Sequence, residues 1–319
     1  LFQVLTRTRT RKRRKKRERL NNPIILNSTC CDGHSVTVKK KDLKRLNDGR
    51  MLNDTLIDFY MKYLSTTFRD KIPDLESRIF IFSTYFYTKL TENGFNYDNV
   101  SRWTRKTNLF EDLSFVFIPI NESGHWSLAI ISIGGGRFSV LHLDALSMHD
   151  TNRIGRNLLR YLRNEWRRKQ SKKLPETFAK ENGKIESIDV PRQKNGYDCG
   201  MFVCAYAQKI FEDLQVYLIE SKENTKHDDT FFISPLEDSN MNVDKYVRIS
   251  FVKVVNGLRQ REKMNWFDSR YITNMRVKLQ NMISQMGQKQ RQEENTTITT
   301  TTTYTTPTTS RRCFEKEFS

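Results

Sequence analysis

Residues 190–214, VPRQKNGYDCGMFVCAYAQKIFEDL, decide the fold of this chain. The part before Cys199 is polar and contains Pro191 and Gly196, which is typical of a loop. The part after it is almost wholly apolar, so we expect a buried central helix from Cys199 to Leu214. A cysteine in the first turn of a helix lies where free N–H groups and the helix dipole favour a thiolate. The segment therefore predicts a central helix that carries a candidate nucleophile.

Around that helix the chain alternates between strand and helix patterns. Short apolar runs predict strands at residues 78–82 (RIFIF), 115–120 (FVFIPI), 126–133 (WSLAIISI), 138–143 (FSVLHL) and 185–190. Three glycines at 134–136 predict the turn of a hairpin. Helical spacing predicts helices at residues 54–64, 84–90, 151–168, 243–254 and 269–286. We therefore predict an α+β fold, in which helices flank a mixed sheet of about four or five strands.

The positive charge of the chain is concentrated near residue 1. The net charge is +18, and residues 1–22 hold ten Lys/Arg and one acid, so 10 − 1 = +9 lies there and 18 − 9 = +9 on the rest. Like charges this dense repel one another, and we expect residues 1–32 to be a disordered basic arm. The arm could serve as a nuclear localisation signal or contact nucleic acid, or it could be a solvated tail without a specific function. We favour import, and expect the protein in the nucleus.

Two further segments depart from globular composition. Residues 295–309, NTTITTTTTYTTPTT, have no apolar face, so we expect a disordered Thr-rich tail at 288–319,. Residues 220–242 are polar and are expected to form an insertion loop. The remaining prediction is one folded domain at 33–287. Two tails and a loop would explain a hydrophobic fraction of only 37%.

Composition excludes several protein classes. No stretch approaches the roughly 18 apolar residues that span a bilayer, and no secretory h-region follows the basic start. We therefore expect no membrane contact. Five cysteines do not make a disulfide scaffold in a chain of 319 residues,. Cys30, Cys31 and His34 lack a second pair of zinc ligands, and no phosphate-binding fingerprint is present, so we expect no metal and no cofactor.

Three segments, at residues 124–127 (GHWS), 141–144 (LHLD) and 190–200, suggest the chemistry of a cysteine hydrolase. Cys199 would be the nucleophile, and His125 would pair with the thiolate and protonate the leaving amine. Asp144 would orient the imidazole, because it and His125 lie at matching positions on strands that we expect to pair. The Gln193 side-chain amide and the Cys199 backbone N–H would form an oxyanion hole. Gly200 would leave room for a substrate carbonyl.

Each of these residues also has an ordinary structural interpretation. A cysteine at a helix start is usually structural, and Cys204 is expected to be a core residue. Asp144 alone could cap a turn. His142 is an alternative candidate for the imidazole, since it lies two residues before Asp144 on the same face of the strand. His149 lies in the loop that follows. The catalytic interpretation rests on the whole set occurring together.

The set resembles the Ulp/SENP family of SUMO-specific cysteine proteases. Residues 195–200 (NGYDCG) resemble the family's segment around its nucleophile, and residues 52–60 (LNDTLIDFY) resemble its "LND…INFY" helix start. The order His, Asp, Gln, Cys is also the family's order. The resemblance covers about residues 35–265 and implies a papain-like, adenain-like fold with catalytic His125, Asp144 and Cys199 and an oxyanion Gln193.

The resemblance also implies a substrate. Family members cleave after a Gly-Gly C-terminus, and aromatic residues roof a narrow tunnel for the two glycines. Trp126 matches one tunnel tryptophan, whereas Met51 stands where the family has the other. Asp54 matches a position that faces the modifier's tail. Trp103, in the stretch 102–105, is expected either to contact substrate or to be a core aromatic.

The leading hypothesis is a cysteine isopeptidase or endopeptidase that removes SUMO from lysines, trims SUMO chains or matures precursors. Its partners would be SUMO or SUMO-conjugated proteins, whose acidic surfaces the basic domain would attract, and the enzyme would be a monomer. The spelling of residues 57–64 (IDFYMKYL) resembles the branch that trims poly-SUMO chains. Alternatives are a protease for another ubiquitin-like modifier, an acyltransferase of the same fold, and a non-catalytic modifier-binding protein with a nucleic-acid-binding arm.

Overall fold

The computed structural model describes residues 22–29, 35–71, 79–110, 113, 115–134, 137–170, 184–224 and 266–303. Most of the basic arm lies outside the described residues. So do the Cys30, Cys31 and His34 group, most of the 220–242 insertion, the helix expected at 243–254 and the end of the Thr-rich tail.

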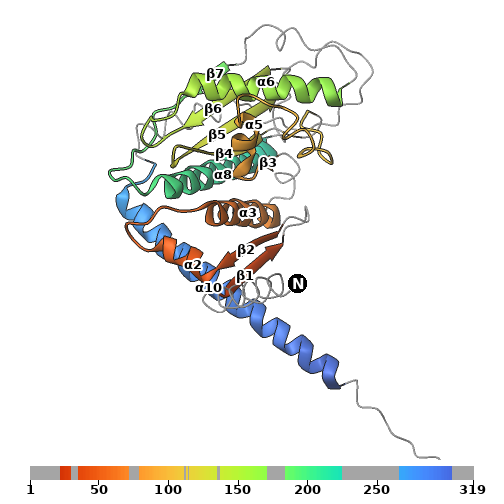
Figure 1. The fold of residues 1–319 in the computed structure, drawn as a ribbon, viewed down its shortest axis with the longest axis vertical. Helices are drawn as coiled ribbons and strands as arrows, with labels where there is room; N and C mark the ends of the chain where they lie inside the picture. The colour runs from red at the N-terminus through yellow and green to blue at the C-terminus, as the bar shows by residue number, and fades with distance from the viewer. Residues whose placement is uncertain are drawn as a thin grey trace, which may run out of the picture.

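A five-stranded mixed sheet forms the centre of the molecule, which confirms the predicted fold class (Figure 1). Its strands follow the chain in the order β3-β4-β5-β6-β7. Their bounds are Ile79–Ile81 (β3), Phe115–Glu122 (β4), His125–Gly134 (β5), Arg137–Leu143 (β6) and Lys184–Ser187 (β7). The three central strands are antiparallel, and each edge strand pairs in parallel with its neighbour.

Two helical layers cover the faces of this sheet. Helices α5 (Tyr85–Thr91) and α6 (Thr151–Lys169) lie on one face, and α3 (Asp54–Lys71) and α8 (Cys199–Asn224) on the other (Figure 1). The strands alternate accordingly, because successive side chains point to opposite faces. In β4, Phe115 and Phe117 pack in the α8 layer and Val116 in the α6 layer.

The first residues of α3 and α8 carry the local signals that the sequence predicted. Asn53 caps α3, since its side-chain oxygen accepts the Leu56 N–H at 3.3 Å,. Helix α8 begins at Cys199, and the Asp198 carbonyl accepts the Phe202 N–H at 3.0 Å. The core position expected for Cys204 is confirmed, because its side chain is fully buried.

Described secondary structure extends at both ends beyond residues 33–287, the expected bounds of the folded domain. Strands β1 (Ile24–Thr29) and β2 (Ser35–Lys39) form an antiparallel hairpin, followed by α2 (Lys40–Leu43) and the short helix η1 (Lys44–Leu46). Helix α10 (Ser269–Thr303) packs across β1 and α8, and so continues past the expected limit of 287. The charge of the arm obscured the apolar β1, and threonine, a poor helix former, obscured the end of α10.

None of the helices in the described ranges is both long and apolar enough to cross a bilayer. The start of α8 and the start of β5 lie close together. The site residues gather there, as the next subsection describes.

Candidate active site

Cys199 is the first residue of α8 and its side chain is buried. The helix that follows is apolar enough to pack against β5, which fixes its first turn beside the sheet. The N–H groups of that turn have no carbonyl partner within the helix, so they favour negative charge nearby. The sulfur is therefore placed where a thiolate is stabilised.

His125 and Asp144 meet beside it, as the sequence predicted. His125 begins β5, and Asp144 comes directly after β6. Because Leu128 pairs with Leu143, the register places Asp144 one step diagonally from His125 on the same face,. The His125 Nε2 atom lies 2.6 Å from Asp144 Oδ1, and His125 lies close enough to Cys199 for the sulfur to raise the pKa of its imidazole. Nε2 is engaged with Asp144, so Nδ1 is the nitrogen left for sulfur.

This arrangement favours the charged imidazole. Burial lowers the pKa of His125, but the hydrogen bonds with Asp144 and Cys199 outweigh it and raise that pKa to about 9. Burial raises the pKa of Asp144, yet the hydrogen bond from His125 and two backbone N–H groups hold it well below its usual range. These N–H groups belong to Leu146 and His149, each 2.9 Å from a carboxylate oxygen. Asp144 is therefore a fixed carboxylate.

The two alternative histidines, His142 and His149, hydrogen-bond to hydroxyl groups near this pair. His142 Nε2 is 2.9 Å from Ser127 Oγ and its Nδ1 is 2.8 Å from Thr151 Oγ1, so both of its nitrogens are engaged away from sulfur. Burial lowers the pKa of His142 to about 4. His149 Nδ1 lies 2.7 Å from the same Ser127 hydroxyl. Neither histidine shares a contact with Cys199 as His125 does.

One group of side chains in the described ranges has the spacing of metal ligands. His125, Asp144 and His149 offer ligand atoms that all lie within 4.8 Å of one another. In this structure those atoms already hydrogen-bond to protein groups: His125 to Asp144, and His149 to Ser127. These atoms therefore already have hydrogen-bond partners within the protein.

Gln193 is buried in the loop before α8, and one of its two amide hydrogens is already engaged. Its Nε2 donates to the Asn195 carbonyl at 2.7 Å, which leaves one amide hydrogen. Its Oε1 is buried and has no hydrogen-bond partner among the described residues. The remaining amide hydrogen and the Cys199 N–H are the two donors of the predicted oxyanion hole.

The predicted substrate residues adjoin the start of α8. The Trp126 indole is buried and donates to the Leu52 carbonyl at 3.3 Å, while Met51 beside it is exposed. Asp54 lies in the first turn of α3. A Cβ on Gly200 would lie 2.9 Å from the Leu52 Cβ. Glycine is therefore needed here so that α8 can pack against Leu52. The reason expected from the sequence was a different one, namely space for a substrate carbonyl.

Trp103 lies apart from these residues on a loop beside α6. Its ring is 37% exposed and packs edge-on against Phe86 at 5.8 Å, so it combines both interpretations from the sequence. The next residue, Thr104, is buried and donates to the buried carboxylate of Glu165 at 2.5 Å. That bond fixes the loop against α6.

The sequence interpretation missed Arg276. This side chain is buried on α10 and hydrogen-bonds to Asp198, the residue before Cys199. The sequence could have indicated it, because this arginine lies within the apolar stripe formed by Ile272, Met275 and Leu279. A charged residue is seldom buried in such a stripe unless it is paired with an opposite charge.

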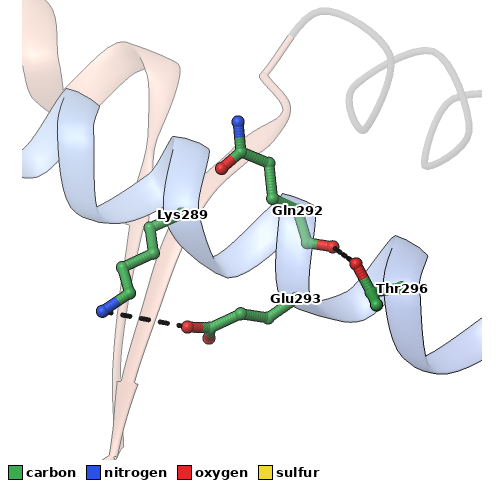
Figure 2. A pocket seen from close by; sticks show the side chains of 4 residues that line it. All are labelled: Lys289, Gln292, Glu293 and Thr296. Atoms are coloured by element: carbon green, nitrogen blue, oxygen red, sulfur yellow. Dashed lines mark hydrogen bonds and ion pairs between the residues drawn. The ribbon is translucent and has the colours of Figure 1, made fainter.

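A surface depression at the far end of α10 holds none of the site residues. Figure 2 shows its lining side chains, Lys289, Gln292, Glu293 and Thr296, all from one helix. Lys289 Nζ lies 3.9 Å from Glu293 Oε1, and Thr296 donates to the Gln292 carbonyl at 2.9 Å. The depression begins thirteen residues beyond Arg276, about 20 Å along the helix.

Comparison with protein families gives a match over the same region. A model described as the Ulp1 protease family, C-terminal catalytic domain, matches residues 50–232. "Probable ubiquitin-like-specific protease 2A" of Arabidopsis thaliana is 33% identical over 193 residues, covering 54% of this chain and 24% of the relative. Sentrin-specific protease 2 of Homo sapiens is 35% identical over 176 residues, covering 55% and 28%. The chain thus matches about a quarter of the length of these relatives.

Solved structures show the same fold. A crystal structure described as the de-sumoylating protease has a TM-score of 0.63 at 24% identity, covering 86% of this chain and 96% of that one. The SUMO protease Ulp1 with its catalytic cysteine oxidised to a sulfinic acid has a TM-score of 0.50 at 25% identity, covering 79% and 85%.

Proposed function

Because the chain belongs to the Ulp1 protease family, we propose that it is a cysteine peptidase acting on SUMO. It hydrolyses the bond after the modifier's C-terminal Gly-Gly, and so releases SUMO from substrate lysines, shortens SUMO chains or matures precursors. The family match over residues 50–232 and the relatives named for sentrin and ubiquitin-like modifiers support this substrate class.

One observation carries the proposal. The His125 side chain hydrogen-bonds to Asp144 and lies beside Cys199, the first residue of a buried helix, which raises the pKa of His125. A pKa of about 9 keeps His125 protonated near neutral pH, so it is held as the imidazolium partner of a thiolate,. Such an ion pair supplies the nucleophile and the general acid together.

The reaction then proceeds through a thioester. The Cys199 thiolate attacks the glycine carbonyl carbon, and the carbonyl electron pair moves onto oxygen. The Cys199 N–H and the free amide hydrogen of Gln193 stabilise that oxyanion. When the carbonyl re-forms, the C–N bond breaks, and the leaving lysine amine takes the proton from His125.

Water completes the turnover. Neutral His125 accepts a proton from water as the oxygen attacks the thioester, and the second tetrahedral intermediate expels the Cys199 thiolate. Asp144 stays ionised throughout, since the hydrogen bonds that lower its pKa persist in both steps. Its role is to orient the ring and stabilise the imidazolium.

Substrate selection resides beside Trp126. In the proposal its indole covers the Gly-Gly tail from one side and Met51 covers it from the other, while Asp54 and Trp103 contact the modifier. A buried indole bonded to the Leu52 carbonyl is a rigid surface, whereas an exposed Met51 is adaptable,. This difference predicts a looser roof than two tryptophans would form.

A cleavage assay tests the proposal. The 319-residue chain is incubated with a protein carrying SUMO on a lysine, and free SUMO is measured. Wild type and Cys204→Ala are expected to release it, whereas Cys199→Ala is expected to release none, because Cys199 lies beside His125 and Cys204 is a core residue. Full cleavage by Cys199→Ala would refute the mechanism.

A further inference from the structure

Arg276 is a buried cation that joins three separate segments of the fold. Its side chain is 4% exposed. Its Nε and Nη2 atoms lie 2.9 and 2.5 Å from Asp198 Oδ1. Its Nη1 donates to the Arg45 carbonyl at 3.2 Å, and Nη2 donates to the Tyr197 carbonyl at 3.4 Å. Helix α10 is thereby attached to the loop that carries the nucleophile.

Asp198 connects Arg276 both to the first turn of α8 and to the turn that precedes it. Its carbonyl accepts the Phe202 N–H in the first turn of α8, and it directly precedes Cys199. Its second carboxylate oxygen, Oδ2, accepts the Asn195 side-chain amide at 2.7 Å. The carboxylate thus links Arg276 to the start of the helix and to the turn before it.

Asn195 extends the connection to the oxyanion donor. Its side-chain oxygen accepts the N–H groups of Tyr197 and Asp198 at 3.1 and 3.0 Å, which closes the turn. Its backbone carbonyl accepts the Gln193 amide at 2.7 Å. Because the buried Oε1 of Gln193 has no hydrogen-bond partner among the described residues, the bond made by Nε2 decides where the amide points. A continuous series of hydrogen bonds therefore runs from Arg276 to Gln193.

We propose that Arg276 is a positioning residue, which sets the Gln193 amide and the Cys199 sulfur through Asp198 and Asn195. This rests on the function proposed above. It also assigns part of the catalytic unit to α10, which lies beyond the family match at residues 50–232. Arginine is required, because its planar fork bonds Asp198 and the Arg45 carbonyl at once, and a lysine ammonium cannot reproduce that geometry.

The test compares Arg276→Lys with Arg270→Lys in the 319-residue chain. Arg270 is exposed on the same helix, so its variant controls for the substitution itself. Initial rates are measured with a fluorogenic amide of the SUMO C-terminus, below the thermal midpoint of each variant, and are normalised to the folded fraction. We expect Arg276→Lys to lower kcat about 10- to 100-fold with KM changed less than about threefold. Arg270→Lys is expected to match wild type.

Two more measurements separate positioning from stability. In a Gln193→Ala background the Arg276→Lys effect on kcat is expected to shrink, because the two changes disturb one donor and do not multiply. Alkylation of Cys199 by iodoacetamide, mapped by mass spectrometry, is expected to slow in Arg276→Lys; this needs no SUMO substrate and so remains informative if wild type fails to cleave. Unchanged kcat per folded molecule, multiplying effects or unchanged alkylation would each overturn the proposal.

Discussion

Replacing Asp144 by asparagine removes the charge that stabilises the His125 imidazolium while keeping the side chain's size. The pKa of His125 stands at about 9 against an ordinary value of 6.5, a difference of about 2.5. At 1.36 kcal/mol per unit this is about 3 kcal/mol, shared between Asp144 and Cys199. Assigning the larger part to Asp144, whose hydrogen bond raises that pKa most, gives about 2 to 3 kcal/mol, or roughly 30- to 150-fold in rate,.

The assay is kcat/KM for SUMO release from pH 5 to 10. In wild type the alkaline limb is expected near pH 9, where His125 loses the proton that it gives to the leaving amine,. In Asp144→Asn the rate at pH 7 falls by the factor above, and the limb moves toward pH 6.5. Asp150→Asn is the matched control, since that exposed carboxylate caps α6 through the Arg153 N–H without touching the site. Activity of Asp144→Asn within threefold of wild type, with an unmoved limb, would refute the reasoning.

Three further predictions concern packing, pH and the arm. Gly200→Ala is expected to destabilise the fold by about 1 to 3 kcal/mol in thermal or urea unfolding, because the new Cβ would lie 2.9 Å from Leu52,. Gly196→Ala, with no atom within 4 Å of the new Cβ, is expected to be near neutral. The pKa of His125 is higher in the folded than in the unfolded state. Its contribution to the free energy of unfolding is therefore fully present below pH 6.5 and is lost as the pH rises through about 9,. That loss, about 3 kcal/mol, is expected to disappear in His125→Gln. Neutralising the Lys/Arg of residues 7–19 is expected to lower the nuclear fraction of the protein in cells.

Each of these has a contradicting outcome. Equal unfolding midpoints for the two glycine variants would show that α8 does not approach Leu52 closely. A pH dependence of unfolding shared by wild type and His125→Gln would place the titrating group elsewhere. An unchanged nuclear fraction would leave the arm without its import role.

The sheet and the placement of the candidate catalytic residues were predictable because each depends on local patterns. The apolar runs of β5 and β6 select strands, and the antiparallel pairing of these two strands fixes the register that brings His125 to Asp144,. The buried start of α8 was predictable from the change of composition at Cys199. His125 and Asp144 lie at the ends of neighbouring strands, and Cys199 lies at the start of a helix that its apolar composition makes evident.

The remainder depends on partners that are distant in sequence. Strand β1 gains stability by packing with α10, whose Gly287 lies against the Ile25 carbonyl, and no local signal outweighs the adjacent basic run. Arg276 and Asp198 are 78 residues apart, and their pairing follows from the tertiary path of α10. Gly200 looked like space for a substrate, because the approach of Leu52 is visible only in three dimensions.

The most direct test of the central claim is covalent capture. SUMO and ubiquitin that carry an electrophile in place of the C-terminal carboxylate are incubated with the chain, and the modified cysteine is mapped. The account predicts labelling by the SUMO probe at Cys199, and its loss in Cys199→Ala. Labelling at another cysteine, or by the ubiquitin probe alone, would contradict it.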